Sequence, residues 1–328
     1  MAKEIIGIDF GTANTRIYSS LTKGVVFYEP TSIALDSYTG DIKEVGFLSK
    51  KIQDRTPYNI TVIGPIKNGQ VYDVDVATEF LKKVFKDLRL NSIIRGITVV
   101  LSCPSESSKV SQQALIEIGK RIQAKEIYIE SSAKLAALGA GESIDSPEAT
   151  LVCNIGCGVT DIACLSLGEI VECTSTYIAG GSFDEAIRRN LILEQHIQSG
   201  LSACETVKKK IGNLSSNSEN KLSEIKGKDT ITSLPTSAIV SSSFVKKSIQ
   251  PLCDIIAMKV NDVILNLSSE LSSDLVSNGL LLTGGSALLP GLKEYLSSRL
   301  SIPVKVAAEP ENATINGLGV FIEKLLNK

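Results

Sequence analysis

The sequence is poor in residues on which several functional classes depend. Its 328 residues include no tryptophan, two methionines and one histidine, and its seven cysteines form no Cys-x-x-Cys pair. Cys153, Cys157, Cys164 and Cys173 lie in strand-like segments with no histidine nearby. We therefore interpret them as small buried side chains rather than metal ligands. No Ser-His-Asp triad can be assembled around His196, which we interpret as a surface residue.

A surplus of positive charge and long apolar runs are also lacking. The chain has 34 Lys and Arg residues against 36 Asp and Glu, a formal net charge of −2. With no basic excess to neutralise phosphates, we expect no nucleic-acid partner. No stretch approaches the ~20 apolar residues of a bilayer span, and the short apolar run near the N-terminus does not resemble a signal peptide. Together with the free thiols, these absences predict a cytoplasmic protein.

What the sequence does contain is a pattern that occurs twice. Residues 5–10 form a short apolar run that ends at a glycine-containing turn, and residues 24–28 form another strand-like run. After a polar linker at 142–149, the same order returns as residues 151–155, a Gly/Thr turn and residues 161–167. Such a duplication predicts two similar α/β domains that face each other across a cleft.

We place the first domain at residues 1–143 and the second at 144–312. Smaller subdomains are expected at about 30–75 and about 181–255. A C-terminal helix at 313–328 is expected to return to the first domain. Apolar residues at helical spacing also predict a helix that starts near Asp75 and is capped by that residue.

The turn after the first strand has the composition of a phosphate-binding loop. Gly11 lets the backbone approach a phosphate closely, and Thr12, Ala13 and Asn14 offer backbone or side-chain donors. Asp9, at the end of the strand, is a candidate to hold Mg²⁺ through water. The alternative is an ordinary hairpin turn of the same composition.

The turn in the second half repeats this device. Gly156, Cys157, Gly158 and Thr160 follow the strand at 151–155. We predict that the two turns clamp a triphosphate from opposite sides.

A third glycine-containing loop follows the apolar run at 279–282. Gly284, Gly285 and Ser286 stand between this predicted strand and a predicted helix. Glycines provide a surface without side chains, on which a flat purine ring can lie. As an isolated motif the loop has little specificity, but it is the third member of an ordered set.

These segments together resemble the actin/Hsp70/sugar-kinase ATPases, and within them the bacterial actin-like proteins that determine cell shape. GIDFGTANT is similar to the first phosphate loop, GPIKNGQVYDVD to the segment before the first long helix, and LLTGGSALL to the adenosine loop. GGSFDEAI and CETVKKKIG resemble the stretches that flank the adenosine. The resemblance covers nearly the whole chain. It implies two actin-like, ribonuclease H-like domains around a nucleotide cleft, each with an inserted smaller subdomain.

The resemblance also implies ligands and partners. ATP or ADP with Mg²⁺ is the expected cofactor, and Gly180 and Gly181 are expected to line the nucleotide. Glu205 and Lys208, three residues apart on one helix, are expected to face the ribose and base. The alternative is that the two are simply exposed residues on the helix surface. The expected partners are further copies of the chain in filaments, and paralogous subunits of the same kind.

Three positions depart from the family pattern where chemistry would occur. Ser132 stands where the family usually places a glutamate that activates water, and a hydroxyl cannot act as that base. Asn154 replaces an aspartate, and Val159 replaces a threonine. These changes predict weak or lost ATP hydrolysis with nucleotide binding retained. The alternative is a shift in register, with Thr160 or Asp161 taking the lost roles.

The function implied is a filament-forming actin homologue at the cell membrane, involved in cell shape or motility. A small-molecule kinase of the same fold would need the missing carboxylates. A non-polymerising actin-like adaptor of the FtsA or pilus-assembly type remains as the alternative.

A possible membrane contact lies between a predicted helix and the strand at 97–103. Ile93 and Ile94 are adjacent apolar residues flanked by Arg89 and Arg95. At an exposed loop tip they would insert into the inner leaflet of the membrane, which makes the protein peripheral at that membrane. The alternative is that both isoleucines begin the buried strand.

Overall fold

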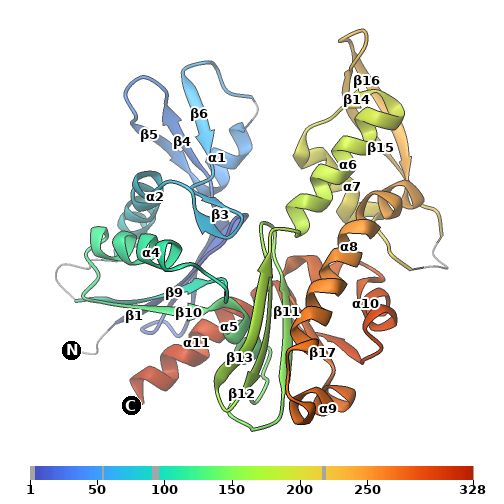
Figure 1. Cartoon of the computed structure of the whole chain (residues 1–328). Helices are drawn as coiled ribbons and strands as arrows, with labels where there is room; N and C mark the ends of the chain where they lie inside the picture. Colours follow the sequence, from blue (N-terminus) through green and yellow to red (C-terminus); the bar gives the residue numbers. More distant parts are fainter. Residues whose placement is uncertain (1–3, 54, 91–95, 216–218, 328) are drawn as a thin grey trace. The chain divides into compact units, whose positions relative to one another are not determined.

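The computed structural model describes residues 4–53, 55–90, 96–215 and 219–327. The chain divides into two compact units, Met1–Ile144 with Asn312–Lys328, and Asp145–Glu311. Each unit contains a five-stranded mixed sheet, and both can be followed in Figure 1.

The sheet of the first unit has the order β10-β9-β1-β2-β3. The strand β1 pairs antiparallel with β2, and β2 with β3, whereas β1, β9 and β10 run parallel. The bounds are β1 Ile5–Phe10, β2 Asn14–Ser19, β3 Gly24–Pro30, β9 Thr98–Cys103 and β10 Glu126–Ser131.

Side chains alternate between the two faces of this sheet, as the twofold period of a strand requires. Ile8 and Leu101 belong to one apolar cluster, together with residues of α2 (Val74–Asp87) and α4 (Lys109–Arg121). Tyr18 and Val100 belong to another, with residues of α5 (Ser132–Gly139) and α11 (Ala313–Leu326). Phe80 on α2 is fully buried, and burial of such a side chain contributes roughly 1.5–3 kcal/mol.

The N-cap of helix α2 lies two residues before the one that the apolar spacing indicates. Asp73, not Asp75, is the N-cap, and its carboxylate accepts hydrogen bonds from the N–H groups of Asp75 and Val76. Asp75 lies in the first turn and forms an ion pair with Arg121 on α4. The predicted cap was therefore wrong, because two aspartates two residues apart both suit a helix start.

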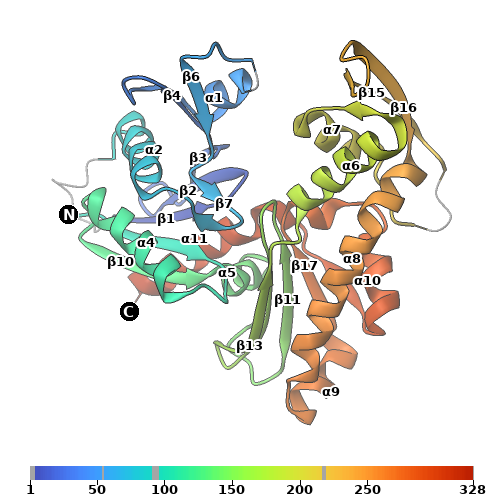
Figure 2. The same ribbon diagram turned by 45° about the horizontal axis from the view of Figure 1, so that its top comes forward.

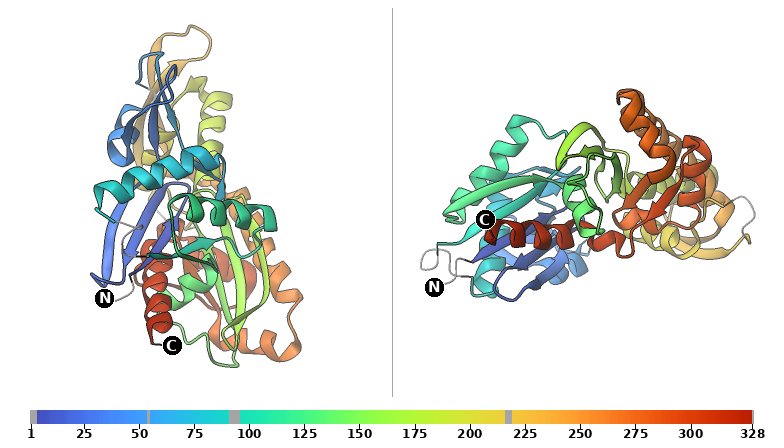
Figure 3. Two further views of the ribbon diagram at one scale, coloured as in Figure 1. Left: turned by 90° about the vertical axis from the view of Figure 1, so that its left-hand side faces the viewer. Right: turned by 90° about the horizontal axis from the view of Figure 1, so that it is seen from below.

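Helices α5 and α11 pack so closely that glycines are required at their contact. A Cβ on Gly317 would lie 1.8 Å from the carbonyl oxygen of Leu135, and one on Gly139 would lie 1.9 Å from that of Ala313. Figure 3 shows α11 along the sheet of the first unit, next to α5. This contact joins the C-terminal helix to the first unit.

The sheet of the second unit repeats the first one strand for strand. Its order is β13-β12-β11-β17-β18, with β11, β12 and β13 antiparallel and β11, β17 and β18 parallel. The bounds are β11 Thr150–Ile155, β12 Thr160–Ser166, β13 Glu169–Thr176, β17 Leu280–Thr283 and β18 Val304–Val306. The duplication inferred from the sequence is therefore present in the strand order and the strand directions.

Each unit also contains a small three-stranded sheet (Figure 2). In the first unit its order is β5-β4-β6, next to α1; in the second it is β14-β15-β16, next to α6 and α7. The bounds are β4 Ile33–Asp36, β5 Ile42–Val45, α1 Gly46–Ile52, β6 Ile60–Ile63, α6 Gly180–Gln195, β14 Ile197–Gln198, α7 Leu201–Ile211, β15 Leu222–Asp229 and β16 Pro235–Ser241.

The remaining elements complete the two units. They are β7 Ile66–Lys67, β8 Gln70–Val71, α8 Ser242–Leu265, α9 Ser269–Asn278, η1 Gly285–Leu288, α10 Leu292–Leu300 and η2 Pro310–Asn312. Within the described part of the chain, none of the helices combines the length and the apolar character that crossing a bilayer demands.

The contact between α5 and α11 gives a stability prediction. Gly317→Ala places a methyl group against backbone, so we expect the free energy of unfolding to fall by about 1–3 kcal/mol or more. Chemical denaturation followed by circular dichroism measures this change. Gly24→Ala is the control, because a Cβ there meets nothing closer than 3.8 Å. Equal stability of the two variants would contradict the packing argument.

Candidate functional site

The two predicted phosphate turns have the same backbone geometry. Gly11 donates its N–H to the carbonyl of Asn14 at 3.1 Å, and Gly156 donates to that of Val159 at 3.0 Å. In each case a Cβ on the glycine would crowd the same carbonyl, at 2.8 Å and 3.1 Å. Each turn therefore closes a hairpin at the end of the first strand of its sheet. A larger residue would clash at Gly11 and would be tightly packed at Gly156.

The residues within the turns differ in exposure. In the first turn, Ala13 is exposed, while Thr12 and Asn14 are half-buried. The hydroxyl of Thr12 accepts a hydrogen bond from the N–H of Gly69 at 2.9 Å, which ties the turn to the segment between β7 and β8. In the second turn Cys157 is half-buried.

The threonine that follows each turn is fully buried. Thr160 is 0% exposed and donates its hydroxyl proton to the carbonyl of Ile178 at 2.7 Å. Thr15, at the matching position of the first hairpin, bonds the hydroxyl of Thr31 at 2.8 Å, and Thr31 donates to the carbonyl of Gly11 at 2.7 Å. The Thr160 hydroxyl therefore stabilises its turn from inside the protein.

In the second unit the structure brings three predicted loops together. The carbonyl of Gly156 accepts hydrogen bonds from the N–H of Gly180 and from the hydroxyl of Ser286, both at 3.0 Å. The N–H of Gly181 donates to the carbonyl of Cys157 at 2.7 Å. The second phosphate turn, the start of α6 and the loop after β17 thus form one hydrogen-bonded cluster.

The glycines of this cluster have different roles. A Cβ on Gly284, whose φ is +84°, would lie 2.3 Å from the carbonyl oxygen of Ile155, so the residue is required for backbone packing. A Cβ on Gly180 would lie 2.7 Å from the Ser286 hydroxyl oxygen. Gly285, in contrast, is exposed, and a Cβ there would meet nothing within 4 Å. Of the predicted adenosine-loop glycines, Gly285 is the one that presents an open surface.

Glu205 and Lys208, which are predicted to face the ribose and base, have different ion-pair partners. Lys208 forms a 2.8 Å ion pair with Asp184 on α6, with side chains 11% and 10% exposed, and donates to the carbonyl of Gly180 at 2.7 Å. Glu205 instead pairs with Lys209 at 2.7 Å. Burial raises the pKa of Asp184 to about 6, and the adjacent Lys208 opposes that rise.

The sequence reasoning missed Asp184. The sequence feature that could have identified it is an acidic residue in the first turns of α6, on a side of the helix that is otherwise apolar and buried. Because Lys208 bonds both Asp184 and the carbonyl of Gly180, the Asp184–Lys208 pair holds the first turns of α6 against α7.

The three positions predicted to have lost catalytic groups lie at the start of a helix, near the end of a strand and in a turn. Ser132 is the first residue of α5 and is buried, and the preceding Ser131 caps that helix through the N–H of Lys134 at 3.2 Å. Asn154 lies near the end of β11, and Val159 lies in the second turn. A hydroxyl, an amide and an isopropyl group therefore occupy the three positions at which the sequence analysis predicts a loss of catalytic groups.

The alternative register is not supported by the geometry. Asp161 is fully buried on β12 and accepts a hydrogen bond from the Ser175 hydroxyl at 2.8 Å. Thr160 is equally buried, as described above. Both side chains therefore already have hydrogen-bond partners within the protein.

Asp9, the predicted magnesium residue, already has protein partners. Its Oδ1 accepts from the Ser102 hydroxyl at 3.0 Å, and its Oδ2 lies 3.4 Å from Nη1 of Arg16. Among the described residues there is no group of three or more acidic, histidine or cysteine side chains suited to a metal. With the Arg16 guanidinium beside it, the carboxylate does not fit a direct magnesium ligand in this arrangement. The sequence reasoning missed Arg16. It follows the turn by two residues, and Asp9 precedes the turn by two.

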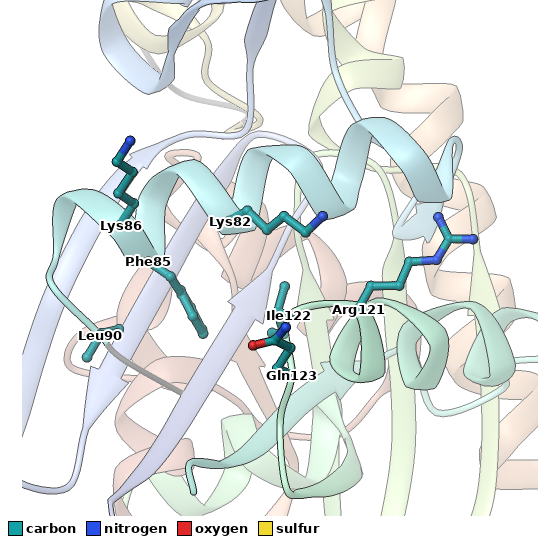
Figure 4. A pocket seen from close by; sticks show the side chains of 7 residues that line it. All are labelled: Lys82, Phe85, Lys86, Leu90, Arg121, Ile122 and Gln123. Atoms are coloured by element: carbon teal, nitrogen blue, oxygen red, sulfur yellow. The ribbon is translucent and has the colours of Figure 1, made fainter. Parts of the chain in front are cut away.

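A cavity elsewhere in the first unit contains none of the predicted site residues. It has a volume of about 260 Å³ and lies between α2 and the end of α4. Figure 4 shows Phe85 pointing from α2 into this space and Lys86 pointing away from it. The lining residues are Lys82, Phe85, Lys86, Leu90, Arg121, Ile122 and Gln123. The predicted membrane residues Ile93 and Ile94 lie outside the described residues.

The buried Asp184–Lys208 pair gives a second prediction. Lys208→Met leaves a buried carboxylate without its counter-charge, so we expect the free energy of unfolding to fall by about 3 kcal/mol or more. Asp184→Leu combined with Lys208→Met removes both charges and is expected to cost less. Urea denaturation measures both. Lys209→Met, which removes an exposed pair, is the control and should cost below about 1 kcal/mol; equal costs for Lys208→Met and Lys209→Met would refute the role of the pair.

Comparison with known proteins places the chain in a family. The family model described as MreB/Mbl protein matches residues 3–328. The cell shape-determining protein Mbl of Bacillus subtilis (strain 168) is 33% identical over 320 residues, which cover 98% of this chain and 96% of Mbl. The cell shape-determining protein MreB of Escherichia coli (strain K12) is 32% identical over 326 residues, with 98% and 93% covered.

Solved structures with a similar fold include members of the same family. The crystal structure of MreB 5 of Spiroplasma citri bound to AMPPNP matches with a TM-score of 0.95 at 31% identity, covering 100% of this chain and 98% of the other. A MamK double helical filament matches with a TM-score of 0.83 at 19% identity, covering 98% and 99%, which shows a shared fold. The predicted actin-like fold is confirmed. With a family model matched along nearly the entire sequence and relatives more than 30% identical, the chain belongs to the MreB/Mbl family.

Proposed function

We propose that this chain binds an adenine nucleotide through its two glycine hairpins and the loop cluster of the second unit. The observation that carries this proposal is the identical N–H to carbonyl closure of the turns at Gly11 and Gly156. Such turns present backbone N–H groups to phosphate oxygens. The related MreB 5 of Spiroplasma citri, 31% identical, has been crystallised with AMPPNP and with ADP.

The residues divide into three groups: two that bind phosphate and one that binds the adenosine. In the first unit, Thr12, Ala13 and Asn14 present the turn to phosphate. In the second, the turn at 156–158 presents backbone donors, and Gly180 and Gly181 hold that turn against α6. Gly285 offers an open surface to the base, with Ser286 beside it, and Glu205 and Lys208 flank this region from α7.

We propose further that copies of the chain assemble into cytoskeletal filaments that act in cell shape or motility. Family membership supports this proposal, since relatives over almost the whole chain are named for determining cell shape. Paralogous subunits of the same family are candidate partners in mixed filaments.

Hydrolysis of the bound nucleotide is proposed to be weak or lost. Activation of water needs a base whose pKa lies near neutrality, and the Ser132 hydroxyl does not have one. The Asn154 amide carries no negative charge. Loss of one general base lowers a rate by about 10²–10⁴, while binding through backbone N–H groups is unaffected.

This proposal predicts filaments without rapid phosphate release. We expect purified protein with ATP to form filaments by electron microscopy, while phosphate release stays near background. Ser132→Glu restores a carboxylate at the start of α5, where the helix dipole favours it, and should raise release by roughly tenfold or more. Ser132→Gln, of the same size but without a base, is the control.

The outcomes separate the alternatives. Dispersed particles in the presence of ATP would favour a non-polymerising adaptor. Phosphate release by the wild type at a rate that Ser132→Glu does not increase would refute the proposed loss of hydrolysis.

We also propose peripheral attachment to the inner leaflet of the cell membrane. The support is the sequence alone, in which Ile93 and Ile94 are flanked by Arg89 and Arg95. Apolar residues beside basic ones bind anionic lipid surfaces.

Membrane attachment is tested by sedimentation with anionic liposomes. The double variant Ile93→Ser/Ile94→Ser is expected to sediment several-fold less than the wild type, because both apolar anchors are lost. Ile231→Ser, an exposed isoleucine in the second unit, is the matched control. Equal sedimentation of wild type and double variant would exclude these residues as the anchor.

A further inference from the structure

A row of polar side chains crosses the sheet of the first unit, one from each strand, beside the first phosphate turn. Asp9 on β1 is the cross-strand partner of Arg16 on β2, which is the partner of Tyr28 on β3. In the other direction Ser102 on β9 bonds Asp9, and Glu130 on β10 is the register partner of Ser102. Asp9 precedes the turn by two residues and Arg16 follows it by two.

Arg16 is held in place from both sides. Its Nη1 lies 3.4 Å from Oδ2 of Asp9, and its Nη2 donates to the Tyr28 hydroxyl at 3.1 Å. The guanidinium carbon also lies 4.3 Å from the centre of the Tyr28 ring, a cation–π contact. The guanidinium is therefore fixed beside Asp9 by three interactions.

The pair is largely removed from solvent. The side chains of Arg16 and Asp9 are 11% and 16% exposed. A buried carboxylate is either protonated or paired with a positive charge. Arginine stays protonated in proteins, so Arg16 keeps its positive charge beside Asp9. Burial raises the pKa of Asp9, while Arg16 and the Ser102 hydrogen bond lower it.

The pair changes what the carboxylate offers to a cation. An unpaired aspartate beside a phosphate turn attracts Mg²⁺, directly or through water. Here the carboxylate already has a permanent positive charge beside it, which repels a second cation. That positive charge also attracts phosphate, for which guanidinium is a strong partner.

The Arg16 guanidinium is not saturated by the protein. Its Nε is buried and has no hydrogen-bond partner among the described residues. The Arg16 guanidinium thus has more N–H donors than the surrounding side chains have acceptors for it.

We propose that Arg16 takes the place of a divalent cation as the positive charge at the first phosphate turn, so that nucleotide binding depends on Arg16 and little on Mg²⁺. This inference rests on the proposed nucleotide binding and specifies its electrostatics. It assigns Asp9 the role of orienting Arg16 rather than of holding a metal.

The test compares the dissociation constant of a fluorescent ATP analogue, mant-ATP, in excess EDTA and in excess Mg²⁺. For the wild type we expect the two constants to differ by less than about fivefold. Arg16→Leu exposes the phosphates to the unpaired Asp9 carboxylate, so its affinity in EDTA should fall by roughly tenfold or more, as expected for one lost charge-assisted interaction. Mg²⁺ should then restore much of the loss.

Further variants keep the test valid if Arg16→Leu folds poorly. Arg16→Lys retains a positive charge and should keep the low dependence on Mg²⁺. The double variant Asp9→Asn/Arg16→Leu removes both charges and should also show little dependence. Arg121→Leu, an exposed arginine of the same unit, is the matched control and should behave as the wild type.

Two results would overturn the inference. One is wild-type binding that weakens about fiftyfold or more in EDTA, and the other is an equal EDTA-to-Mg²⁺ ratio for wild type and Arg16→Leu. Absence of mant-ATP binding by the wild type in both conditions would instead refute the proposed nucleotide binding, and this inference with it.

Discussion

Close approach of backbone segments with no side chain between them is the constraint on which the candidate site depends. In each unit, a glycine N–H bonds the carbonyl three residues further on and closes the hairpin, and the strand order around both hairpins is the same. In the second unit the carbonyl of Gly156 also accepts from α6 and from the loop after β17. Because Gly284 leaves room for the carbonyl of Ile155, that third segment can reach the turn.

This arrangement separates binding from catalysis. The proposed phosphate contacts use backbone N–H groups, which no substitution of a neighbouring side chain removes. Catalysis of hydrolysis uses side chains such as a carboxylate base, which substitution removes at once. The hydrogen bond that closes the turn at Gly156 joins backbone atoms, so it does not depend on which side chains stand at Ser132 and Asn154.

The fold class and the two hairpin turns were predictable because local sequence restricts them. Glycines at the ends of apolar strands require particular turns, and the repeated order indicates duplication. The partners of individual side chains were not predictable from spacing. Lys208 and Glu205 share a helix face, yet Lys208 pairs with Asp184 and Glu205 with Lys209. These choices depend on how α6 packs against α7, which the local sequence does not specify.

Arg16 shows why the electrostatics of the first turn required the structure. Read along the chain, Asp9 stands before a glycine turn and predicts a cation, while Arg16 stands seven residues later with no evident role. The antiparallel register of β1 and β2 makes them neighbours on one face, and Tyr28 on β3 completes the contact. A carboxylate whose charge is already balanced attracts a second cation only weakly. The register of β1 and β2 therefore determines whether Asp9 pairs with an arginine or holds a metal.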